Sequence, residues 1–322
     1  MRFQENNFQM VKVYDNIIPD KLCQILISAF QSCKDKEFVD DNNCPCFTQV
    51  NLNHASRSMI KLSTPFVETA YEKYKKDIKS KYELEGFDGQ RGYTSFGKEH
   101  AKGKKQGDLK EFWHFGQYLD DDEYSKFNYP KNQLVEELPK FNDIGKKVFR
   151  SLEKTAIYVL RAISLYLDLE EDHFDKYVKK GNSILRPIHY PPIKTKPKGA
   201  ERAAAHGDIN LITLLMGAHG RGLQVLTNDG EWIDAIAKED EIVINVGDML
   251  SRYTNNKLKS TVHKVINPPK ELWKKSRYSI PFFLHPIGTM SLNVLDSCID
   301  EKNPIKYDFI TAHEFLIQRL KD

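Results

Sequence analysis

The sequence has few of the features that mark secreted or membrane proteins. None of its 322 residues lie in an apolar run that approaches the roughly 20 residues of a membrane-spanning helix, and the first residues lack the apolar segment of a signal peptide. The five cysteines are unevenly spaced and odd in number, unlike a disulfide framework. We therefore expect a soluble protein of a reducing compartment, located in the cytoplasm.

An excess of charge of one sign is also missing. The chain has 48 Lys+Arg against 45 Asp+Glu, a formal net charge of +3, and its basic residues are scattered along the sequence. This distribution gives no indication of nucleic-acid binding. Cys44 and Cys46 are separated by one residue, which is shorter than the usual spacing of a zinc-binding pair, and no second pair accompanies them. We expect them to be loop thiols without a cofactor.

The hydrophobic pattern predicts helices first and strands later. Apolar residues recur every three or four positions between Asp143 and Leu167, which predicts a long helix with one apolar face against a sheet. Short runs typical of strands then span residues 183–190, 202–208, 211–218, 222–226, 231–236, 241–249, 258–266 and 277–285, with 290–295 as a further candidate. Asn228-Asp229-Gly230 predicts a tight hairpin turn between two of them. So many short strands suggest a jelly roll.

We therefore predict an α+β fold whose core is a jelly roll, or double-stranded β-helix. Residues 1–118 form a mixed α/β region, with helices at 19–33 and from Thr64 onward. Residues 119–182 contain an exposed connection at 120–140 and the long supporting helix. Residues 183–295 are the jelly-roll domain, and residues 296–322 provide a helix, at 311–320, that packs on the outside of the barrel.

A histidine and an aspartate stand two residues apart in one predicted strand. Because side chains two apart on a strand share a face, His206 and Asp208 could bind one ion. His263, in the predicted strand 258–266, is the candidate for a third ligand. Two histidines and one carboxylate that leave the other positions of an octahedral ion open are typical of non-haem iron(II) oxygenases. Taken alone, His206 and Asp208 also fit a hydrogen-bonded histidine beside a turn-forming aspartate.

Further motifs follow His206 in order. They are Gly222-Leu223-Gln224-Val225, Asn245-Val246-Gly247-Asp248, the segment 260–265 around His263, and Arg277-Tyr278-Ser279. This series resembles the isopenicillin N synthase-like branch of the iron(II) and 2-oxoglutarate-dependent dioxygenases. The resemblance is strongest over residues 183–290, and residues 108–111 with Gly116 also look like the amino-terminal half of that family.

The resemblance implies Fe(II) as the metal, 2-oxoglutarate as cosubstrate, and O2. Arg277 and Ser279 would bind the distal carboxylate of 2-oxoglutarate, and a planar guanidinium suits that task because it can donate two parallel charge-assisted bonds. Tyr190 stands where the family has a tyrosine that contacts the cosubstrate. Three positions depart from the family pattern: Ile188 replaces a common asparagine, Gly207 a Thr or Ser, and Lys264 an Arg.

The implied reaction hydroxylates, desaturates or cyclises a small-molecule substrate and releases succinate and carbon dioxide from 2-oxoglutarate. No catalytic residue beyond the metal ligands is expected, and the sequence shows no evident pair of nucleophile and base. Two alternatives stay open. One is an oxidase of the same fold that does not consume 2-oxoglutarate, and the other is a jelly-roll protein that binds a metal or carboxylate without turnover.

Overall fold

The computed structural model describes residues 67, 70–72, 76–84, 90–100, 106–197, 199–216, 222–236 and 242–321. The predicted helix at 19–33 and the Cys44 and Cys46 pair lie outside these residues. Residues 67 and 70–72 are helical, in agreement with the helix predicted from Thr64 onward. Cys298 is a buried, free thiol.

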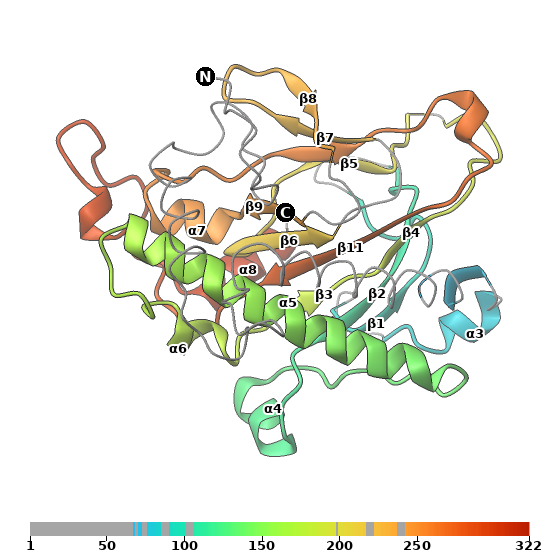
Figure 1. The fold of residues 1–322 in the computed structure, drawn as a ribbon, viewed down its shortest axis with the longest axis horizontal. Helices are drawn as coiled ribbons and strands as arrows, with labels where there is room; N and C mark the ends of the chain where they lie inside the picture. The colour runs from blue at the N-terminus through green and yellow to red at the C-terminus, as the bar shows by residue number, and fades with distance from the viewer. Residues whose placement is uncertain are drawn as a thin grey trace, which may run out of the picture.

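Two antiparallel sheets form the core of the fold (Figure 1). The larger sheet has the strand order β1-β2-β3-β11-β6-β9, and β4 pairs with both β11 and β2. Its strands are β1 (Gly92–Thr94), β2 (Glu111–Gly116), β3 (Ile184–Leu185), β4 (Ile188–Tyr190), β6 (Ile212–Met216), β9 (Ile242–Val246) and β11 (Arg277–Leu284). The smaller sheet has the order β5-β10-β7-β8, from β5 (Ala203–His206), β10 (His263–Val265), β7 (Leu223–Leu226) and β8 (Trp232–Asp234). The predicted jelly-roll core is confirmed.

The two faces of the larger sheet carry different side chains. On β11, Tyr278, Ile280 and Phe282 belong to the main hydrophobic core. Since side chains alternate along a strand, Arg277 and Ser279 point to the opposite face. A second apolar cluster combines residues of both sheets: Phe112, Ile188, Tyr190, Ala203, Leu223, Val225, Ala235 and Val265. The space between the sheets therefore has polar groups set among apolar ones.

Helix α5 (Pro139–Tyr166) covers the outer face of the larger sheet, and Figure 1 shows it crossing in front of that sheet. Ile144 is half-buried, and the other predicted apolar positions are buried, which confirms the predicted packing against a sheet: Val148, Leu152, Ala156, Val159, Ile163 and Leu167. Proline at the first helical turn suits the start of α5, because the amide it lacks has no partner within the helix there. The shorter helices are α3 (Lys76–Ser80), α4 (Asp121–Phe127), α6 (Asp175–Val178), α7 (Asp248–Tyr253) and α8 (Ala312–Lys321).

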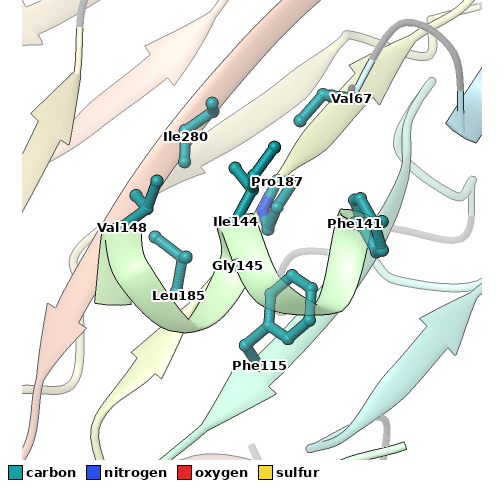
Figure 2. A pocket seen from close by; sticks show the side chains of 9 residues that line it. All are labelled: Val67, Phe115, Phe141, Ile144, Gly145, Val148, Leu185, Pro187 and Ile280. Carbon is teal, nitrogen blue, oxygen red and sulfur yellow. The ribbon is translucent and has the colours of Figure 1, made fainter. Parts of the chain in front are cut away.

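A small apolar cavity lies under α5. Figure 2 shows residues of the helix and of the larger sheet around it, together with Val67 and Pro187: Val67, Phe115, Phe141, Ile144, Gly145, Val148, Leu185, Pro187 and Ile280. A Cβ atom added to Gly145 would come within 2.4 Å of the Phe115 ring, so this glycine allows the close approach of helix and sheet. The lining residues are apolar, so this cavity belongs to the packing of α5 against the larger sheet.

Several predicted boundaries were wrong. The run 183–190 is two strands, because Arg186 and Pro187 interrupt it. Strand β10 contains only His263–Val265 of the predicted 258–266, and β5 ends at His206, before Asp208. Residues 290–295 make only an isolated bridge, between Ser291 and Thr311. The connection 120–140 contains helix α4, which Asp120 caps by accepting a hydrogen bond from the Glu123 amide.

Other local predictions were confirmed. The hairpin of β7 and β8 turns at Asn228-Asp229-Gly230, where Gly230 has a φ of +87° that favours glycine. The carboxy-terminal helix predicted at 311–320 is α8. Among the described residues, no helix has the length and apolar character needed to span a membrane.

Candidate metal centre and its anion-binding neighbour

His206, Asp208 and His263 come together between the two sheets. His206 ends β5 and lies directly opposite His263 on β10, with the ring centroids 4.5 Å apart. Nε2 of His263 lies 3.8 Å from Oδ1 of Asp208. One ligand atom from each residue can be chosen so that all three lie within 4.8 Å of one another, close enough to share one ion.

Asp208 reaches the cluster from a turn, which corrects the strand-alternation argument. The strand stops two residues earlier, and the Asp208 carbonyl accepts a hydrogen bond from the Asp248 amide at 2.7 Å. A Cβ on the intervening Gly207 would lie 3.0 Å from Oδ1 of Asp248 and 3.1 Å from Oγ of Ser260. The small residue at position 207 therefore fits the tight turn that brings Asp208 toward the histidines.

Hydrogen bonds orient all three side chains. Nδ1 of His206 lies 2.6 Å from the Ala204 carbonyl, and Nδ1 of His263 lies 3.1 Å from the Thr261 carbonyl. A protonated Nδ1 donates to the carbonyl in each case, so that Nε2 keeps its lone pair for a metal. The Thr213 hydroxyl, on β6 of the larger sheet, donates to Oδ2 of Asp208 at 2.6 Å.

The electrostatics favour a neutral His206. Burial, together with the neighbouring His263, lowers its pKa to about 4. A neutral imidazole is the form that binds a metal ion. Two imidazoles and a carboxylate are a donor set that fits iron(II).

Arg277 lies on the same inter-sheet face and has unused donors. Its side chain is only 3% exposed, and its guanidinium carbon lies 4.9 Å from the centre of the Tyr190 ring. Nε and Nη1 are buried without a hydrogen-bond partner among the described residues. Burial lowers the pKa of Arg277, while Tyr190 opposes that effect. Because a buried charge without a counter-ion is costly, this guanidinium fits the carboxylate of a bound molecule.

The remaining predicted residues surround Arg277. Tyr190 on β4 pairs in register with Arg277, and Ser279 pairs with Ile188. Tyr190 and Ser279 are both buried, at 2% and 4% exposure. The structure therefore gathers Arg277, Ser279 and Tyr190 into one buried group on the inner face of the larger sheet.

Comparison with known proteins identifies the family. A model described as the 2OG-Fe(II) oxygenase superfamily matches residues 181–286. A 2OG-Fe(II) oxygenase family protein from Caulobacter crescentus, of known crystal structure, is 42% identical, with a TM-score of 0.74 over 82% of this chain and 86% of that one. The chain belongs to this superfamily. The superfamily is named for iron(II) and 2-oxoglutarate, and its oxygenases use O2.

Two more relatives of the superfamily support the assignment. A full-length Neurospora crassa protein, crystallised in complex with alpha-KG, is 29% identical, with a TM-score of 0.70 over 85% of this chain and 83% of that one. A 2-oxoglutarate-Fe(II) type oxidoreductase from Metarhizium majus is 34% identical over 58% of this chain and 51% of its own length. The chain thus spans about half the length of the first curated relatives that it matches.

The departures from the superfamily pattern have local explanations. Ile188 is buried in the apolar cluster between the sheets. Lys264 follows His263 on β10 and places its ammonium 4.1 Å from the centre of the Trp232 ring, so it packs there as a cation against an aromatic face. Neither residue is within the His206, Asp208 and His263 cluster.

Sequence reasoning missed residues that act through tertiary contacts. Thr213 is a polar residue in an otherwise apolar strand run, and this local exception was the available signal. Asp108 accepts a hydrogen bond from the Ala204 amide at 3.2 Å and pairs with Lys110, which is buried close to β5. His114 is buried on β2 and accepts from Nε of Arg186 at 2.5 Å.

Proposed function

We propose that this chain is an Fe(II)- and 2-oxoglutarate-dependent oxygenase that acts on a small molecule. The observation that carries the proposal is the combination of a His-Asp-His cluster with the buried guanidinium of Arg277, whose Nε and Nη1 have no hydrogen-bond partner among the described residues, on the inner face of one jelly roll. The alpha-KG complex of the Neurospora protein supports the same cosubstrate here. The use of cysteine supports our further proposal of a cytoplasmic location.

We assign the roles of the site residues as follows. His206, Asp208 and His263 hold the metal, and the hydroxyl of Thr213 fixes the carboxylate of Asp208. When bound, iron(II) and 2-oxoglutarate supply the activation of O2, with 2-oxoglutarate oxidised to succinate and carbon dioxide. These three residues would hold the ion from the protein side, and the bound ion would supply the site at which 2-oxoglutarate and O2 react.

The second group of residues orients the cosubstrate. Arg277 and Ser279 would donate to its distal carboxylate, and Tyr190 holds the guanidinium in place through its ring. Apolar side chains of the inter-sheet cluster, such as Val225 and Val265, exclude water from the space beside this group. The protein thus orients the cosubstrate and excludes water, while the metal and the cosubstrate supply the activation of O2.

Our proposed division of the chain places this site within residues 183–295. The regions 1–118, 119–182 and 296–322 would then support the jelly roll. Strand β2 (Glu111–Gly116) pairs with β3 and β4, so part of the amino-terminal region extends the larger sheet beside Tyr190.

The test is anaerobic addition of 2-oxoglutarate to the Fe(II)-loaded protein, followed by absorbance spectroscopy. The proposal predicts a weak visible charge-transfer band from a chelated 2-oxo acid, and metal-dependent release of succinate after oxygen is admitted. Arg277→Gln should bind Fe(II) normally and lose most of its affinity for 2-oxoglutarate. Iron binding without the charge-transfer band would favour an oxidase of the same fold that does not consume 2-oxoglutarate. The band without succinate release would favour a jelly-roll protein that binds its ligands without turnover.

A further inference from the structure

A second arginine approaches the same tyrosine as Arg277. Arg202 directly precedes β5 and lies four residues before His206. Its guanidinium carbon is 5.8 Å from the centre of the Tyr190 ring, compared with 4.9 Å for Arg277. The Arg202 side chain is only 4% exposed. Two buried guanidiniums, from the two facing sheets, therefore converge on one aromatic ring.

Neither guanidinium has a carboxylate partner among the described residues. Arg202 makes one long hydrogen bond, from Nη2 to the Lys275 carbonyl at 3.3 Å, and its buried Nε has no partner in this part of the chain. By contrast, the buried ammonium of Lys110 pairs with Asp108 at 2.8 Å and with Glu99 at 2.7 Å. Within the described part of the chain, the ammonium of Lys110 has acidic partners, whereas the guanidiniums of Arg202 and Arg277 have none.

The two arginines also affect each other. Burial and, to a smaller extent, the positive charge of Arg277 lower the pKa of Arg202 to about 10. Like charges that are both withdrawn from water repel strongly, and an anion between or beside them removes that cost. The distal carboxylate of one ligand could accept hydrogen bonds from both guanidiniums, because each carboxylate oxygen has two acceptor sites.

We infer that Arg202 is a second contact for the distal carboxylate of 2-oxoglutarate, so that two guanidiniums, one from each sheet, hold this group. The inference rests on the proposed function, because it assumes 2-oxoglutarate as the cosubstrate. It adds a specificity-determining residue that the Arg-x-Ser motif does not contain. The competing explanation is a structural role, in which Arg202 only ties the segment before β5 to the Lys275 carbonyl.

The test compares two ligands that differ only at the distal end. The probes are 2-oxoglutarate and 2-oxopentanoate, which has the same chain length and a methyl group in place of the distal carboxylate. Each is titrated anaerobically into the Fe(II)-loaded protein, and the Kd is measured from the visible band. Arg202→Gln removes the charge, and Arg202→Met keeps an apolar stem against Tyr190 should the glutamine variant fold poorly. Lys274→Gln is the matched control, because it removes an exposed charge from the segment that Arg202 contacts.

We expect both Arg202 variants to raise the Kd of 2-oxoglutarate by roughly ten- to hundredfold, the range for loss of a hydrogen bond to a charged group. The Kd of 2-oxopentanoate should stay within about twofold, because this ligand has no distal charge to lose. Arg202→Lys should recover part of the affinity, and Lys274→Gln should change neither Kd. Equal weakening of both ligands, or no weakening of either, would overturn the inference.

The outcome also separates this inference from the proposed function. If the unaltered protein binds Fe(II) and shows no band with 2-oxoglutarate, the proposed function fails and the inference fails with it. If the unaltered protein binds 2-oxoglutarate and the Arg202 variants bind it equally tightly, the oxygenase proposal stands and Arg202 is structural.

Discussion

Thr213→Val is the most direct test of how the proposed metal ligands are held. The Thr213 side chain is 2% exposed, and its hydroxyl donates to Oδ2 of Asp208 at 2.6 Å while it accepts from Nδ2 of Asn210 at 2.9 Å. Valine has nearly the same shape and no hydroxyl. The substitution therefore removes one hydrogen bond from Asp208 without opening a cavity, and Asn210 keeps its second bond, to the Ile212 carbonyl.

The expected loss follows from the charge on Asp208. A hydrogen bond to an ionised group contributes about 1.5–3 kcal/mol, and about 1.4 kcal/mol corresponds to a tenfold change in a binding constant. The released carboxylate also gains rotational freedom that metal binding must again remove. We therefore expect Fe(II) to bind Thr213→Val about ten- to hundredfold more weakly, in line with the usual effect of losing a partner of a metal ligand.

The assay is an anaerobic competition titration against a coloured Fe(II) chelator. Thr213→Ser is the matched control, because serine retains the hydroxyl and should bind Fe(II) within a few fold of the unaltered protein. Circular dichroism and thermal melting of the metal-free proteins show whether the valine variant is folded. A folded Thr213→Val protein with unchanged Fe(II) affinity would refute the role that we give to this hydrogen bond.

Three further predictions concern single residues. His206→Ala should leave the protein folded and free of iron after gel filtration, and stoichiometric Fe(II) in that variant would contradict the ligand assignment. For buried Glu111, burial raises the pKa, but hydrogen bonds, including those from Lys79 at 2.7 and 2.9 Å, lower it overall. Glu111→Gln should thus reduce the free energy of unfolding by about 2–4 kcal/mol near neutral pH, and urea titrations should show this difference shrinking as the pH falls below about 4. Gly247→Ala should destabilise by about 3 kcal/mol in the same assay, since its Cβ would lie 2.1 Å from the Asn210 carbonyl oxygen, and an unchanged midpoint would argue against this contact.

The sequence predicted well those features that depend on local periodicity. The apolar positions from Val148 to Ile163 recur at helical spacing, so the buried face of α5 could be read before its partner was known. The turn at Gly230 could also be predicted, because its backbone conformation limits the choice of residue. The order of motifs around His206 and His263 likewise indicated which residues would meet.

Features that depend on contacts between distant segments were not predictable in the same way. β5 ends at His206, opposite His263 where its antiparallel partner β10 begins, and no pattern within residues 202–208 reveals this pairing. The contact of Thr213 with Asp208 depends on the turn between β5 and β6. Arg202 was overlooked because a single arginine before a strand has many uses, and only the convergence on Tyr190 distinguishes it.

The position of the ligand cluster between the two sheets also has a consequence for the stability of the folded protein. The two histidines belong to the smaller sheet, whereas Asp208 is hydrogen-bonded to Thr213 of the larger sheet. An ion bound by all three residues would therefore link the two sheets of the jelly roll. Free iron at about one hundred times its Kd would add about 2.7 kcal/mol to the free energy of unfolding. The iron-free protein would lack this link between the sheets and would unfold at a lower denaturant concentration than the iron-loaded protein.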